Sequence, residues 1–109
     1  MKLNIYEKRK IVKTYEAEAY DLMWGTVEDI TEALNLDAMK TGSDVELAVM
    51  AGKFVTTSRE MVNDFLKDVF EGITDQELKN AKVKEIVKVF VDILRYTITE
   101  IMGVKTSKN

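Results

Sequence analysis

The sequence contains no histidine, no cysteine and no proline, and its five glycines stand apart from one another. Without histidine or cysteine, the usual general base, the usual zinc ligands and the usual activated nucleophiles are missing. Single glycines do not build the glycine-rich loops that bind phosphates. The sequence therefore predicts a protein that is not an enzyme and that holds no cofactor and no metal ion.

An excess of positive charge is also missing. The chain has 16 Lys and Arg against 19 Asp and Glu, a net charge of -3, which does not favour binding to a phosphate backbone. The one basic cluster, Lys8-Arg9-Lys10, is short and follows Glu7, so we interpret it as a solvated turn rather than a binding arm. We expect no nucleic-acid partner.

The sequence also lacks a long hydrophobic segment without charged residues. The longest helical segment includes Lys84, Glu85 and Lys88, and such side chains are costly in hydrocarbon. The chain opens Met-Lys-Leu-Asn without the apolar core of a secretory signal. We therefore expect no membrane association and a cytoplasmic location.

The composition that is present is globular. The 109 residues are 46% hydrophobic and 32% charged, which is enough for one domain around one core. We predict a mainly α (α+β) fold, a compact helical domain of four to five helices with a short N-terminal β-hairpin. The single domain would span residues 1–109, with a strand pair in 2–20, helices in 26–102 and a flexible tail at 104–109.

Alternating residues indicate the strand pair. Leu3 and Ile5 share one side, and Ile11 and Tyr15 follow at even spacing. The intervening residues 7–10 contain no Gly, Asn or Pro, so the usual turn signal of a hairpin is missing. The hairpin is predicted from the alternation alone.

Capping residues mark the helix starts. Thr26, which follows Gly25 and precedes two acidic residues, is expected to cap the first helix. The spacing of a capping box, a Ser or Thr followed three residues later by Glu, occurs at Ser43, Thr57 and Thr74. Thr57 either restarts a helix after a kink or lies within a longer one.

The last long helices are two-faced. In residues 61–70 the apolar side chains fall on one half of a helical wheel, and Gly72 is expected to end that helix. A final helix over residues 82–102 would be about 31 Å long at ~1.5 Å per residue. Its apolar arc covers about half the wheel, so it should contact more than one neighbour and form the spine of the fold.

Two apolar groups are candidates for binding a partner. The helix that contains VELAVMAGKFV is apolar almost all the way round, so it is either central in the core or covered by a partner. The candidate partner-binding residues are Leu47, Met50 and Phe54 on this helix and Met102 and Val104 at the end of the last one. Alternatively, Leu47, Met50 and Phe54 belong to the core alone.

An aromatic pair, Tyr20 and Trp24, stands just before the first helix. Such a pair is either a hot spot for binding a peptide or a lid over the core.

Two segments carry a family resemblance. YDLMWGTVEDI, Tyr20 to Ile30, and FLKDVFEGITDQELKNAKVKEIVKVFVDIL, Phe65 to Leu94, resemble small tail assembly chaperones of siphophages and prophages of Gram-positive bacteria. The similarity spans most of residues 8–102, and its motifs are packing and capping signals. No binding residue carries over from the family.

The resemblance implies a non-catalytic function in the cytoplasm of the host bacterial cell. Such chaperones bind the long helical tape-measure protein, keep it soluble and recruit tail-tube subunits. Two alternatives remain, a permanent structural tail component such as a connector or terminator subunit, and a helical adaptor unrelated to phage. A homo-oligomer is compatible with all three.

Overall fold

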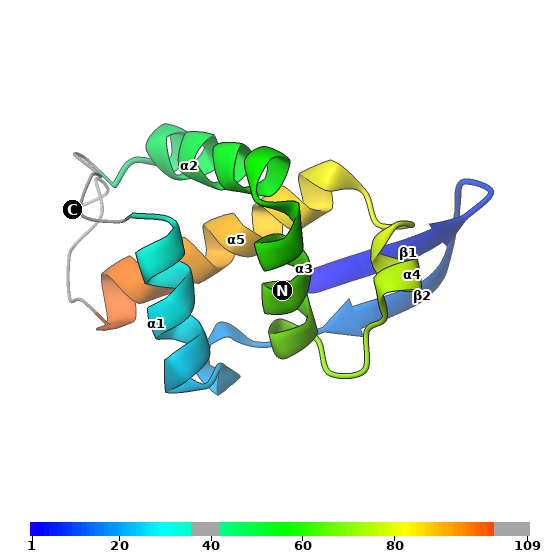
Figure 1. The fold of residues 1–109 in the computed structure, drawn as a ribbon, viewed down its shortest axis with the longest axis horizontal. Helices are drawn as coiled ribbons and strands as arrows, with labels where there is room; N and C mark the ends of the chain where they lie inside the picture. Colours follow the sequence, from blue (N-terminus) through cyan, green and yellow to red (C-terminus); the bar gives the residue numbers. More distant parts are fainter. Residues whose placement is uncertain (36–41, 102–109) are drawn as a thin grey trace.

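A computed structural model describes residues 1–35 and 42–101 of the chain and confirms the predicted fold class (Figure 1). An antiparallel hairpin comes first, and helices follow. The elements in chain order are β1 (Lys2–Glu7), β2 (Lys10–Glu16), a 3-10 turn η1 (Ala19–Asp21), α1 (Trp24–Ala33), α2 (Asp44–Thr57), α3 (Arg59–Val69), α4 (Asp75–Leu78), α5 (Val83–Tyr96) and a π-helical turn η3 (Thr97–Ile101).

The hairpin turns without glycine. Lys8 and Arg9 both have positive φ angles, 50° and 70°, a pairing typical of tight hairpin turns that usually contain Asn-Gly. The backbone conformation therefore matches the expected turn, although its usual residues are absent. β1 faces the core through Leu3 and Ile5, whereas Ile11 on β2 is exposed despite its place in the apolar alternation.

The expected start of the first helix is wrong. α1 begins at Trp24, two residues before Thr26, and its N-cap Met23 provides no side-chain hydrogen bond. The start of α2 is confirmed, because the Ser43 hydroxyl accepts a hydrogen bond from the Glu46 amide at 3.2 Å.

A new helix does begin near Thr57, but Thr57 is not its N-cap. Thr57 is the last residue of α2, and its hydroxyl donates to the Lys53 carbonyl at 2.6 Å. Ser58 ends α2 and precedes α3 with φ -127° and ψ 52°, which turns the chain between the two helices.

Of the stop and the start predicted around Gly72, the start is found, whereas the helix ends earlier than predicted, at the extended C-cap residue Phe70. α3 ends at Val69, and Gly72 has a φ of 88°, which only glycine adopts without steric cost. The capping box at Thr74 is complete: its hydroxyl accepts from the Glu77 amide at 3.1 Å, and the Glu77 carboxylate accepts from the Thr74 amide at 3.1 Å.

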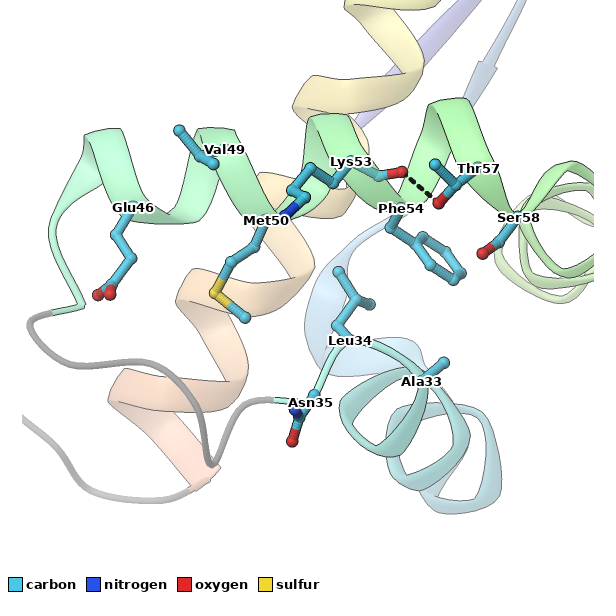
Figure 2. Close-up of a pocket in the computed structure, with 10 residues that line it drawn as sticks. All are labelled: Ala33, Leu34, Asn35, Glu46, Val49, Met50, Lys53, Phe54, Thr57 and Ser58. Carbon is cyan, nitrogen blue, oxygen red and sulfur yellow. Dashed lines mark hydrogen bonds between the residues drawn. The ribbon is translucent and has the colours of Figure 1, made fainter.

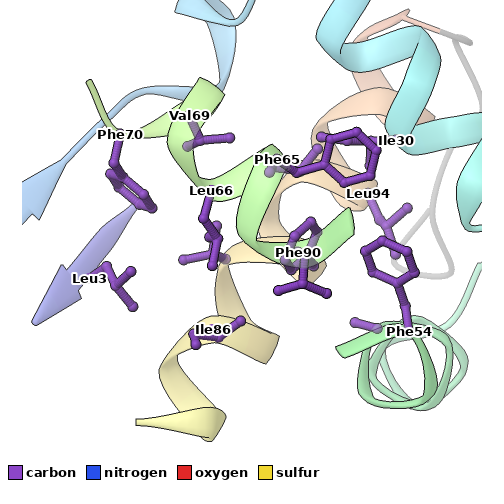
Figure 3. Packing of buried hydrophobic residues seen from close by; sticks show 14 of the residues in the cluster. Leu3, Ile30, Phe54, Phe65, Leu66, Val69, Phe70, Ile86, Phe90 and Leu94 are labelled. Atoms are coloured by element: carbon purple, nitrogen blue, oxygen red, sulfur yellow. The ribbon is translucent and has the colours of Figure 1, made fainter. Parts of the chain in front are cut away.

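α5 is the spine of the fold, as predicted, and packs against α2 and β1. The rings of Phe54 and Phe90 meet edge to face with centroids 5.3 Å apart, and Phe65 lies 5.9 Å from Phe54, so one aromatic cluster joins α2, α3 and α5 (Figure 3). The buried residues of α5 are Ile86, Val89, Phe90, Ile93 and Leu94.

The end of the spine changes its winding. After Tyr96 the chain forms the π-helical turn η3. The hydroxyl of Thr97 donates to the Ile93 carbonyl and that of Thr99 to the Arg95 carbonyl, each at 2.8 Å. Such backbone hydrogen bonds from Thr side chains compete with the helix ladder. The expected end at Met102 lies outside the described residues.

None of the helices within residues 1–35 and 42–101 combines the length and the apolar character that a membrane span needs.

Candidate protein-binding surface

The structure separates the five predicted partner-binding residues. Leu47 is 1% exposed and Phe54 6% exposed, so both belong to the core, and their proposed availability to a partner is corrected. They are buried because their face of α2 packs against α5. Met50 is half-buried against the same core. Met102 and Val104 lie outside the described residues.

Met50 and Phe54 nevertheless line an open groove between the end of α1 and α2, with a volume of about 420 Å³ (Figure 2). Phe54 contributes to its inner wall, and Met50 reaches toward it from α2. The remaining lining residues are Ala33, Leu34, Asn35, Glu46, Val49, Lys53, Thr57 and Ser58.

The apolar side chains that α2 presents to solvent are different ones. Val45 and Val49 are both exposed, on the side of the helix away from Leu47. The sequence predicted that this helix is either central in the core or covered by a partner. α2 instead has one buried face and a smaller exposed apolar face.

The largest exposed apolar side chains lie around η1 and the start of α1. Tyr20 is 70% exposed, Met23 75% and Trp24 63%. We call these three residues the aromatic turn. Leu22, between them, is half-buried and packs on the core, which fixes the segment while its neighbours face solvent. Leu22, and not the aromatic pair, therefore covers the core at this point. Of the two interpretations of Tyr20 and Trp24, their exposure favours a binding surface over a lid on the core.

A second open groove, about 440 Å³ in volume, runs between α1 and α3. We call it the α1–α3 groove. Met61, expected on the apolar face of its helix, is 45% exposed here. The apolar lining residues are Ala33, Met61 and Phe65, and the polar ones are all acidic: Asp29, Glu32, Asp64 and Asp68.

Sequence reasoning missed this groove because the two rows of acids belong to different helices. On α3, positions 61, 64, 65 and 68 fall on one helical face, and on α1 positions 29, 32 and 33 do the same. Each row alone is typical of a solvated helix face. Only the side-by-side packing of α1 and α3 brings them together.

Most of the perturbed ionisable groups in the described residues lie elsewhere, where the hairpin meets α4 and α5. The exception is Lys67 on α3, whose pKa is raised chiefly by its hydrogen bond to Asp75. The pKa of Glu77 is lowered, first by the hydrogen bond from Tyr15, then by those from the Thr74 amide and Lys13. The pKa of Tyr6 is raised, mainly by its hydrogen bond to Glu85. Both shifts come from contacts that hold the hairpin against α4 and α5.

Within residues 1–35 and 42–101, no three acidic side chains are placed to hold a metal ion. Family models, curated proteins and solved structures contain no match to this chain. Function is therefore inferred from the residues themselves.

Proposed function

We propose that this chain is a non-catalytic assembly chaperone that binds the tape-measure protein of a siphophage tail and helps recruit tail-tube subunits in the host cytoplasm. The observation that carries the proposal is the exposure of Tyr20, Met23 and Trp24 together. The resemblance of residues 20–30 and 65–94 to such chaperones agrees with it.

The chemistry of the aromatic turn suits transient binding of a helical protein. Trp and Tyr bury a large area with few rotatable bonds, and they dominate the energetic centres of interfaces. Met adds an adaptable side chain that accepts varied apolar surfaces. A long helical partner that must be kept soluble offers repeated apolar faces, which a surface of this kind would cover.

The test is co-expression with the long helical protein encoded immediately downstream, followed by size-exclusion chromatography with light scattering. The expected result is that this protein becomes soluble and co-elutes with several copies of the chain. Tyr20→Ala with Trp24→Ala should abolish co-elution. Val45→Ala with Val49→Ala, which also shortens exposed apolar side chains but on α2, should not.

Two results would contradict the proposal in different ways. If the wild-type chain leaves the helical protein insoluble and runs alone as a closed ring, a structural tail subunit replaces the chaperone. If the aromatic-turn variant co-elutes as well as the wild type, the binding surface lies elsewhere on the chain.

A further inference from the structure

The aromatic turn lies within the longest stretch of the sequence that has no positive side chain. Residues 14–39 contain seven Asp and Glu but no Lys or Arg. The carboxylates nearest to the aromatic turn in sequence, Glu18, Asp21 and Glu28, are all exposed. Within the described ranges, none of these three takes part in an ion pair. The exposed apolar side chains are therefore accompanied by negative charge that has no counterpart in the chain itself.

The exposed rings of the aromatic turn also lack a cation. Elsewhere this chain places a lysine over a tyrosine: the Lys13 ammonium lies 4.7 Å from the centroid of the Tyr15 ring, and that of Lys82 lies 4.5 Å from the Tyr6 ring. In the part of the chain that the structure describes, no such cation lies over Tyr20 or Trp24. A cation from another molecule can therefore reach these ring faces, and Trp attracts one more strongly than Tyr or Phe.

We propose that the aromatic turn binds a helical segment of its partner that carries Lys or Arg beside apolar residues. The apolar side chains pack on Met23 and the two rings. A docked segment removes water from the neighbouring carboxylates, which is costly unless the segment also supplies positive charge. An uncharged apolar helix leaves the carboxylates unpaired, and an acidic one meets charges of the same sign.

The spacing on α1 fits such a segment. Trp24 and Glu28 stand one helical turn apart, with their Cβ atoms about 6 Å from each other. A partner helix with a Lys or Arg three or four positions from an apolar residue spans the same distance. One face of that helix can therefore contact the Trp24 ring and the Glu28 carboxylate together, while Asp21, next to Tyr20 in η1, offers a second position for a cation.

This inference rests on the proposed function, since it specifies the chemistry of the partner that the same surface binds. Within a long helical protein, it selects the segments in which basic residues recur at helical spacing from apolar ones. Helices with acidic polar faces would be bound weakly, even where their apolar faces are equally large.

The first experiment measures the binding of two synthetic helices to the purified full chain by fluorescence anisotropy. Both helices have the same face of Leu, and the remaining positions are Lys in one and Glu in the other. The Lys helix should bind at least about tenfold more tightly at low salt. The difference should shrink near 1 M salt, where the Debye length is about 3 Å. Equal affinities, or tighter binding of the Glu helix, would overturn the proposal.

Neutralising the carboxylates tests their role. The variant Glu18→Gln/Asp21→Asn/Glu28→Gln keeps the size of each side chain and removes its charge. It should bind the Lys helix at least about fivefold more weakly, as expected for the loss of several exposed ion pairs. Binding of the Glu helix should not weaken. Because all three residues are exposed, circular dichroism should show an unchanged fold.

A matched control neutralises three exposed glutamates elsewhere, Glu60→Gln/Glu71→Gln/Glu100→Gln, with the same change in net charge. It should bind the Lys helix as the wild type does, to within about twofold. A control that weakens binding as much as the first variant overturns the proposal, because net charge alone would then explain the preference. So does a first variant that binds the Lys helix as tightly as the wild type.

Trp24→Leu tests the contact between cation and ring, because it keeps an apolar side chain and removes the aromatic face. It should weaken binding of the Lys helix several-fold and leave that of the Glu helix unchanged. An equal loss for both helices contradicts a cation over Trp24.

Failure of this inference differs from failure of the proposed function. If neither synthetic helix is preferred and the helical protein encoded downstream still co-elutes with the chain, the chaperone function stands and the basic segment is rejected. If the Lys helix is preferred and that protein stays insoluble, the chaperone function is rejected, whereas the charge preference of the aromatic turn stands.

Discussion

The hydroxyl of Tyr15 donates a hydrogen bond of 2.6 Å to the carboxylate of Glu77, 62 residues further along the chain. Glu77 is also the acidic partner in the capping box of α4, and its other oxygen lies 3.3 Å from the Lys13 ammonium. One carboxylate therefore completes a helix start and fastens the hairpin to it. This contact connects the N-terminal strands to the helical part of the fold.

Glu77 should make stability depend on pH. Its pKa is lowered in the folded protein, chiefly by the Tyr15 hydrogen bond, from an ordinary value of 4.5. A lowered pKa means that the stabilisation is present above pH 4.5 and is lost as pH falls through the folded-state pKa. Urea unfolding of Glu77→Gln should show lower stability than wild type at pH 7, with a difference that shrinks below pH 4.5.

A double-mutant cycle identifies the source of that effect. Tyr15→Phe removes the hydrogen bond and keeps the ring, so the losses from Tyr15→Phe and Glu77→Gln should not add. Two results would contradict the assignment of the pH effect to the Tyr15–Glu77 hydrogen bond. One is that the two losses in free energy of unfolding add, and the other is that the stability difference between wild type and Glu77→Gln stays constant from pH 7 to pH 3.

The hairpin turn should be open to stabilisation. Lys8 and Arg9 both adopt positive φ angles, which cost about 1 kcal/mol each for residues with a side chain. Lys8→Asn with Arg9→Gly supplies the residues that such a turn prefers. We expect a gain of about 1 kcal/mol in the free energy of unfolding, measured by chemical denaturation.

Two substitutions on α2 distinguish its buried face from its exposed one. Leu47→Ala should lower the free energy of unfolding by about 2–5 kcal/mol, because it leaves a cavity against α5. Val49→Ala, two residues away on the exposed side, should change it by no more than about 0.5 kcal/mol. Both variants are measured by thermal and denaturant unfolding. If Val49→Ala lowers the free energy of unfolding as much as Leu47→Ala does, the exposed side of α2 is also covered.

Trp24, the only tryptophan, reports on the aromatic turn directly. Because it is 63% exposed, its fluorescence should be quenched readily by iodide in the free protein and be protected when the helical partner is bound. Trp24→Ala should leave stability within about 0.5 kcal/mol and weaken partner binding by about 2 kcal/mol or more. Quenching that the partner does not change would place the contact elsewhere.

The sequence predicted those features that depend on neighbouring residues. The caps at Ser43 and Thr74, the turn at Gly72 and the two-faced pattern of α5 are local, since each is set by side chains within one or two turns of the backbone. The start of α1 was misjudged because Thr26 is a good capping residue in isolation. In the fold, Leu22 is held on the core and the helix begins at Trp24.

Tertiary packing decided which apolar residues are buried, and therefore the candidate site. Leu47 and Val49 have similar local surroundings, yet the approach of α5 to one side of α2 buries the first and leaves the second exposed. The α1–α3 groove likewise exists only because two helices separated along the chain lie side by side. The sequence alone determined a capped, mainly helical chain without histidine or cysteine chemistry. Its surfaces were decided by long-range contacts, because burial depends on which elements meet and not on the residues next in sequence.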